Sequence, residues 1–269
     1  MRRKYIASLA LLLAVVLFVS VIFGSSIVNV SRLSFFGPLG GTQGATTVFV
    51  DPAYFYRDYS LLPVGSKFTV HVNVSDVTDL FTWQVNMTWN PSILNLSRVI
   101  TGPFLNQTTS ANKTSSAPAY FGGLGYVMSV KNNSRGYVAM TESILEDALP
   151  GSVSGISGSG RLVSVEFLVV GYGSCDLVLD TVSSLATTLL SSTGVSLTFS
   201  KANGYFSNKA IGDVNGDRHV NGVDFGIFAP SYGSSLGQPA YKRECDLNHE
   251  GHIDGVDFGM FAPNYGRSV

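Results

Sequence analysis

The strongest constraint on the fold is a duplication near the C-terminus. A segment that begins at Asp213 recurs at Asp246, 33 residues later, and the two copies end in Tyr-Gly at Tyr232 and Tyr265. Each copy has polar residues at alternate positions, followed by Gly-Val-Asp-Phe-Gly. A repeat of fixed period indicates two copies of one supersecondary unit. The chain therefore ends in a duplicated module to which the remaining residues are attached.

Each copy carries oxygen ligands at the spacing of a calcium loop. Calcium takes six to eight oxygens, which a helix-flanked loop supplies from positions 1, 3, 5, 7, 9 and 12. Position 7 contributes its backbone carbonyl, and position 9 often acts through water. We therefore predict two structural calcium ions. The expected ligands are Asp213, Asn215, Asp217, His219, Asn221 and Asp224 in loop one, and Asp246, Asn248, Glu250, His252, Asp254 and Asp257 in loop two.

Two other interpretations of these loops are weaker. Solvated surface carboxylates would not explain the fixed period. His219, His249 and His252 suggest a softer metal such as zinc, but the surrounding hard oxygens and the lack of a cysteine set favour calcium.

The two loops differ at position 6, where a sharp turn favours glycine. Loop two has Gly251, whereas loop one has Arg218, and a non-glycine residue in the left-handed conformation costs about 1–2 kcal/mol. Loop one also has fewer carboxylates. The hypothesis is that loop one binds calcium more weakly than loop two.

Paired calcium loops, each followed by one short helix and closed by Asp at position 12, resemble a dockerin type I module over residues 211–267. The resemblance implies that the module folds around its ions and docks through near-symmetric helices onto a cohesin. The partner-binding residues that it implies are Gly222, Val223, Phe225, Gly255, Val256 and Phe258.

Upstream of the module, the hydrophobic pattern has period two. Apolar residues alternate with polar ones over 68–74, 81–89 and 163–169, which is typical of half-buried antiparallel strands. Short apolar runs at 93–100, 126–130, 136–141, 175–179 and 195–199 are further expected strands, and 143–149 is an expected helical turn. Eight or nine strands without a long amphipathic helix predict a mainly β protein with a β-sandwich.

Three segments of this region resemble cohesin domains in order and spacing. They are 70–80, with its alternating valines, then Trp89-Asn-Pro-Ser-Ile-Leu94, and Gly158–Gly171, in which a small-residue turn leads into an alternating strand. The resemblance covers about 47–206. It implies a nine-stranded jelly-roll sandwich related to carbohydrate-binding modules, with a short turn between the strands at 68–74 and 81–89.

The N-terminus indicates export. Arg2, Arg3 and Lys4 precede an apolar run from about 5 to 23, so residues 1–24 are expected to be a signal peptide or a membrane anchor. Residues 25–46 are an expected flexible spacer, 47–206 the sandwich and 207–269 the dockerin-like module. A secreted or cell-surface location agrees with the Asn-x-Ser/Thr sequons, which are glycosylation candidates at Asn29, Asn73, Asn86, Asn95, Asn106, Asn112 and Asn132.

The sequence offers no catalytic constellation, so we predict that the chain is not an enzyme. His71, the one histidine of the sandwich, lies on the polar face of an alternating strand. The aromatic run from Tyr54 to Tyr59 fits either sugar stacking or packing. Cys175 and Cys245 receive no role.

These expectations describe a non-catalytic assembly protein that acts through calcium-dependent cohesin–dockerin interaction. The expected partners are cohesin- or dockerin-bearing proteins, including copies of this chain or its own sandwich. A net charge of −1 gives no basis for binding nucleic acid. The alternative is a carbohydrate-binding sandwich that the dockerin tethers to a system for polysaccharide binding or catabolism.

Overall fold

The computed structural model describes residues 44–105, 125–144 and 154–269. Its strands are β1 (Thr47–Asp51), β2 (Tyr54–Tyr56), β3 (Lys67–Thr88), β4 (Leu94–Thr101), β5 (Gly125–Asn132), β6 (Tyr137–Ile144), β7 (Ile156–Val169), β8 (Ser174–Leu179), β9 (Thr188–Ser191), β10 (Ser200–Ala202) and β11 (Gly204–Ser207). Its helices are α2 (Gly222–Phe228), η4 (Ala229–Ser231), η5 (Arg243–Cys245), α3 (Gly255–Phe261) and η6 (Ala262–Asn264).

The segment expected to be a signal peptide or anchor, 1–24, lies outside the described residues, as does most of the spacer. In the part of the chain that the structure describes, no helix has the length and apolar character needed to cross a membrane.

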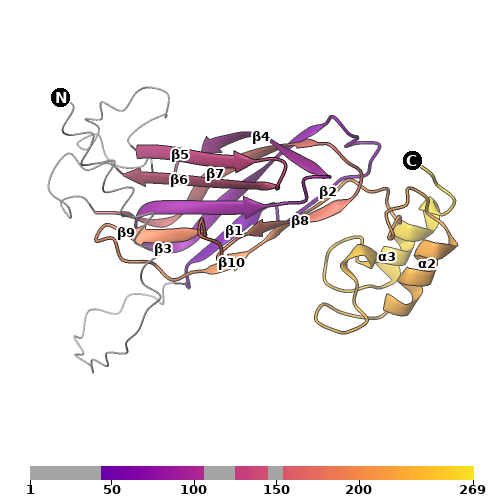
Figure 1. Cartoon of the computed structure of the whole chain (residues 1–269). Coiled ribbons are helices and arrows are strands. Elements are labelled where there is room, and N and C mark those ends of the chain that lie inside the picture. Colours follow the sequence, from indigo (N-terminus) through magenta and orange to yellow (C-terminus); the bar gives the residue numbers. More distant parts are fainter. Residues whose placement is uncertain (1–43, 106–124, 145–153) are drawn as a thin grey trace.

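The strands form a β-sandwich in which the long strand β3 belongs to both layers. The first half of β3 pairs with β1 and β7, and these strands pair in turn with β10 and β4. The second half pairs with β6, β8 and β9, and the sheet continues from β6 to β5 and from β8 through β11 to β2. Figure 1 shows the strands as one body, with α2 and α3 at one end of it.

The continuity of β3 corrects the turn expected between 68–74 and 81–89. Val74, Val77 and Leu80 are all buried, so the inward-facing positions are three residues apart here. The register shifts at both intervals, and Asp76 and Asp79 take the left-handed conformation, with φ of 52° and 58°. These irregularities let one strand keep its apolar residues inward while it passes from one layer to the other.

Three other expectations about the strands need correction. Eleven strands form in the described residues where the resemblance implies nine, and two of the eleven, β2 and β10, are only three residues long. The run 195–199 is not a strand, since it makes only one isolated bridge, between Leu190 and Ser196. Ser143 and Ile144 belong to β6 and not to a helical turn, because Ser143 pairs with Thr82 of β3; residues 145–149 lie outside the described part.

Alternating side chains build the core of the sandwich. Phe68, Val70, Val72 and Val74 are buried, as the pattern predicts, and so are the apolar residues of 163–169. Trp83 is fully buried between the layers. The sandwich therefore has a continuous hydrophobic core of its own.

The C-terminal module is built as two interlocked copies. Phe228 and Phe261, the last residues of α2 and α3, are buried and stack with their ring centroids 5.4 Å apart. Backbone hydrogen bonds join each loop to the chain that follows the helix of the other copy. Val220 N donates to Arg267 O over 2.8 Å, and Gly233 N donates to Ile253 O over 2.7 Å. Each copy therefore completes the other.

Candidate calcium loops and docking surface

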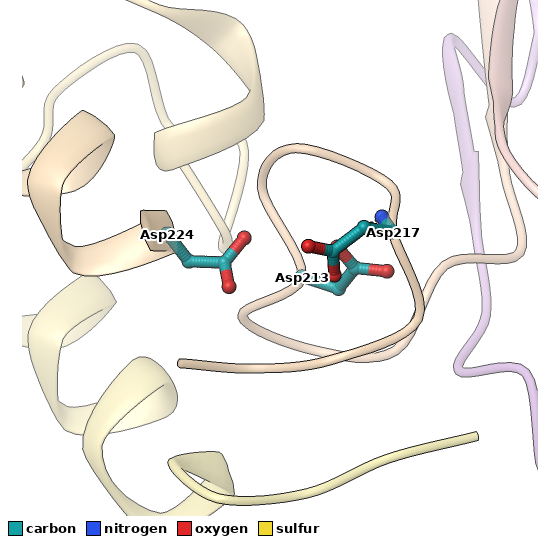
Figure 2. Close-up of side chains that lie close together, drawn as sticks. All are labelled: Asp213, Asp217 and Asp224. Atoms are coloured by element: carbon teal, nitrogen blue, oxygen red, sulfur yellow. The ribbon is translucent and has the colours of Figure 1, made fainter. Parts of the chain in front are cut away.

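Loop one gathers three carboxylates at one point. Side-chain oxygens of Asp213, Asp217 and Asp224 all lie within 4.8 Å of one another. Asp213 and Asp217 come from the loop, and Asp224 reaches toward them from the first turn of α2 (Figure 2). Asp213 and Asp224 are only 2% and 0% exposed, so two of these negative groups are taken out of water.

The position-12 residue of loop one is held by backbone N–H groups. Asp224 Oδ1 accepts from Val214 N at 2.8 Å and from Asn215 N at 3.1 Å, and its Oδ2 accepts from Asn221 N at 2.9 Å. Asn221 Oδ1 in turn accepts from Val223 N, which makes a capping box at the start of α2. Asp224 therefore closes the loop and begins the helix with one carboxylate.

Loop two repeats this arrangement. Asp257 Oδ1 accepts from Leu247 N and Asn248 N, and its Oδ2 accepts from Asp254 N at 2.8 Å. Asp246 and Asp257 are 1% and 0% exposed. No second group of three metal-ligating side chains as close as the one in loop one occurs among the described residues.

The donor chemistry of the loops fits calcium. The group in loop one consists of carboxylates alone, which a hard cation prefers. The rings of His219 and His252 are held elsewhere, because each Nδ1 lies 2.8 Å from a serine hydroxyl, that of Ser268 or Ser235. Asn221 and Asp254, at position 9, use a side-chain oxygen to cap a helix, which suits a ligand that acts through water.

Backbone strain does not separate the two loops as the sequence suggests. Each loop is left-handed at positions 4 and 6: Gly216 and Arg218 in loop one have φ of 81° and 74°, and His249 and Gly251 in loop two have φ of 61° and 90°. Each loop therefore has one glycine and one non-glycine residue in this conformation. The strain at Arg218 is matched by strain at His249, so only the carboxylate count still favours weaker binding at loop one.

The sandwich contacts the C-terminal module through charged groups. Nη1 and Nη2 of Arg267 donate hydrogen bonds to the two carboxylate oxygens of Asp58, at 2.7 and 2.6 Å. Asp58 also accepts from Ile211 N at 3.1 Å. Burial acts to raise the pKa of Asp58, but hydrogen bonds from Arg267 and Ser60 hold it well below its usual range. A second ion pair joins Arg243 to Asp176 of β8 at 2.5 Å.

Aromatic rings complete this contact. Tyr54 of β2 stacks on His249 of loop two, with ring centroids 4.7 Å apart and planes 7° apart. Tyr56 meets the same imidazole edge-on, and the Arg243 guanidinium lies over the Tyr205 ring. The aromatic run that the sequence leaves open between sugar stacking and packing is therefore engaged with the C-terminal module.

Sequence reasoning missed the residues of this contact on both sides. Asp58 and Arg267 are 209 positions apart in the chain, and no local pattern marks either one. Only the fold brings them together.

The predicted partner surface is exposed. Val223 and Phe225 of α2 are 57% and 44% exposed, and Val256 and Phe258 of α3 are 55% and 44% exposed. Gly222 and Gly255, which precede the two valines, are also exposed. Because the ion pairs and ring stacking with the sandwich come from the loops and the chain around them, these apolar residues remain open to a partner.

The sequons differ in accessibility. Asn73, Asn95 and Asn132 are partly exposed. Asn86 is 3% exposed, and its Nδ2, the atom that would carry a glycan, donates to Asp180 and Ser183. Asn86 therefore does not fit the surface position expected for it. Asn29, Asn106 and Asn112 lie outside the described residues.

Cys175 and Cys245 are both free thiols.

Residues 211–262 match the family model of the dockerin type I domain. This segment is a dockerin. Dockerin type I domains bind calcium, in agreement with the carboxylates of the loops. The comparison with curated proteins returned no match.

Solved structures that resemble the chain include cohesins. One is a non-cellulosomal cohesin from the archaeon Archaeoglobus fulgidus, at 18% identity and a TM-score of 0.41, covering 61% of this chain and 90% of that one. Another is the second type II cohesin module of the ScaA scaffoldin of Acetivibrio cellulolyticus, at 17% identity and a TM-score of 0.43, covering 60% and 94%. A third, the sixth cohesin of scaffoldin B from the same organism, was solved in complex with a Cel5 dockerin, at 14% identity and a TM-score of 0.43, covering 62% and 100%.

Proposed function

We propose that this chain is a non-catalytic assembly protein that presents a cohesin-like sandwich, residues 47–206, and a dockerin, residues 207–269. The observation that carries the proposal is the pair of exposed apolar helix surfaces on a segment that matches the dockerin family. The motifs shared with cohesins in the sandwich support a receptor role for the first module.

The dockerin binds two calcium ions, one in each loop, through the twelve residues named above. Their role is structural. Clustered buried carboxylates such as Asp213 and Asp224 repel one another until a cation joins them, so the free energy of calcium binding becomes free energy of folding.

The partner of the dockerin is the sandwich of another chain. The dockerin already contacts its own sandwich, but it does so through loop residues such as His249 and through Arg267. Its helix surfaces stay exposed, so a second sandwich can cover them. Such a head-to-tail contact joins two different surfaces and can extend into a chain of molecules.

This assembly operates outside the cell, either secreted or held at the surface by residues 1–24. The alternative of carbohydrate binding gains no support from the aromatic run, because Tyr54 and Tyr56 pack on His249.

The test is capture of the full chain by immobilised sandwich, residues 47–206, in calcium and in a chelator. We expect capture in calcium only. The control is the full chain with Val223→Asp and Val256→Asp, which places a charge on both helix surfaces. Capture that is independent of calcium, or that the double variant retains, would contradict the proposal, as would a calcium-loaded chain that is not captured.

A further inference from the structure

A tyrosine of the sandwich contacts a calcium ligand of loop one. Tyr172 lies between β7 and β8, and its hydroxyl donates to Asp213 Oδ2, at position 1 of the loop. The same hydroxyl accepts from Ala210 N at 2.9 Å. One oxygen atom therefore links the sandwich, the junction between the modules and the first calcium ligand.

Loop two has the same arrangement at its own first ligand. Tyr241 donates its hydroxyl proton to Asp246 Oδ2 over 2.6 Å. In both loops that oxygen also accepts from the position-6 backbone, from Arg218 N at 3.0 Å and from Gly251 N at 2.9 Å. The carboxylate of position 1 thus has the same two donors, a tyrosine hydroxyl and a backbone N–H, in each copy.

The two tyrosines come from different modules. Tyr241 belongs to the dockerin itself, five residues before Asp246. The residue five positions before Asp213 is Asn208, whose amide is fully buried against the sandwich. Its Nδ2 donates to the carbonyls of Leu62 and Gly171. The first copy therefore has no tyrosine of its own to place on its first ligand.

Asn208 instead holds the turn that carries Tyr172. It bonds the residues on either side of the tyrosine, donating to Gly171 O at 3.2 Å and accepting from Gly173 N at 2.8 Å. The ring of Tyr172 is further fixed by Tyr59, edge-on at 5.2 Å, and by the Arg218 guanidinium, 5.1 Å from its centroid. Protein groups of both modules thus fix the position of the tyrosine.

We infer that Tyr172 is a positioning residue for the calcium ligand Asp213, so that the sandwich completes the calcium site of loop one. The inference rests on the proposed calcium binding by both loops. Groups that hydrogen-bond a ligand orient it, and their loss typically lowers metal affinity about 10–100-fold. Calcium binding at loop one is therefore coupled to attachment of the dockerin to its own sandwich, whereas loop two is complete within the dockerin.

The test is calcium titration of the full chain by calorimetry, with Tyr172→Phe and Tyr241→Phe as matched variants that keep the ring and remove the hydroxyl. The wild type should bind two ions. Each variant should weaken one site about tenfold and leave the other unchanged, and the double variant should weaken both. A second readout is the rise in Tm on adding calcium, which should shrink in each variant because the stabilisation by a ligand grows with the logarithm of its affinity.

Several outcomes would overturn the inference. Tyr172→Phe could bind both ions as the wild type does, or the double variant could leave one site intact, which would place both tyrosines at one loop. An equal loss of Tm with and without calcium would assign Tyr172 a packing role only. A wild-type chain that binds no calcium would instead overturn the proposed function itself.

Discussion

Glu142 is an ionisable group in the interior of the sandwich. It lies on β6, is 4% exposed, and accepts a hydrogen bond from Trp83 Nε1 at 3.1 Å. Burial raises the pKa of this carboxyl to about 7, and the bond from Trp83 offsets only part of that rise. The sandwich therefore holds a proton on Glu142 at pH values where the unfolded chain releases it.

This proton makes the stability of the sandwich depend on pH. Between the unfolded pKa of 4.5 and the folded pKa of about 7, the folded state binds more protons, so the free energy of unfolding falls as pH rises. We expect Glu142→Gln to remove this dependence, so that the wild type loses about 2 kcal/mol more than the variant between pH 5 and pH 8. Denaturant unfolding followed by the fluorescence of Trp83 and Trp89 measures it, since both tryptophans lie in the sandwich.

Glu166→Gln is the control for this prediction. Hydrogen bonds from Ser97 and Lys67 lower the pKa of the Glu166 carboxyl, so its titration falls below pH 5 in both states. This variant should follow the wild-type slope between pH 5 and pH 8. Parallel curves for wild type and Glu142→Gln would show that Glu142 is ionised throughout.

At the scale of the element, α2 and α3 are two versions of one helix. Both carry Gly-Val-Asp-Phe-Gly, both begin with a capping box, and both expose the same valine and phenylalanine. Because the position-12 carboxylate also caps the helix, the orientation of each exposed surface depends on the calcium loop that precedes it.

The equivalence of the helices predicts redundancy in partner binding. Val223→Asp alone should weaken capture by the immobilised sandwich about twofold, because the surface of α3 remains available. Val223→Asp with Val256→Asp should weaken capture at least about tenfold, since the partner then buries an unpaired charge whichever of the two helix surfaces it covers. The binding isotherm of each variant measures the effect.

Val182→Asp, at a position of the sandwich that is 90% exposed, is the matched control and should bind as the wild type does. Complete loss of binding from one single helix variant would show that only that helix meets the partner.

At the scale of the whole molecule, the dockerin is held at one end of the sandwich and does not hang from a free linker. Residues 204–210 of the junction are buried. The ion pair between Asp58 and Arg267 joins the first part of the sandwich to the last residues of the chain. This contact fixes the direction in which the helix surfaces point.

Removing this ion pair should loosen the dockerin without unfolding the sandwich. In Arg267→Ala, Asp58 keeps its bonds from Ser60 and from Ile211 N, so its carboxylate is not left unpaired. We expect a larger radius of gyration by small-angle X-ray scattering in calcium, with little change in the Tm of the sandwich. Arg98→Ala, which removes an exposed ion pair with Glu166 within the sandwich, should leave the radius unchanged. An unaltered radius in Arg267→Ala would show that other contacts suffice to hold the dockerin.

The features that the sequence by itself determined are local and periodic. The alternation over 68–74 predicted buried valines because successive side chains of a strand point to opposite faces. The spacing of loop one predicted the meeting of Asp213, Asp217 and Asp224, because twelve consecutive residues can wrap only a small volume.

Only the tertiary structure decided which segments distant in the sequence contact one another. It showed that β3 is one strand, because Val77 and Leu80 keep facing the core through two register shifts that period two cannot describe. It brought Tyr172 to Asp213 across 41 positions of the chain. The residue type of a tyrosine does not say which distant group it will contact. The calcium loops can therefore be recognised in the sequence, whereas the contact between loop one and the sandwich is set by packing between modules, which no local pattern encodes.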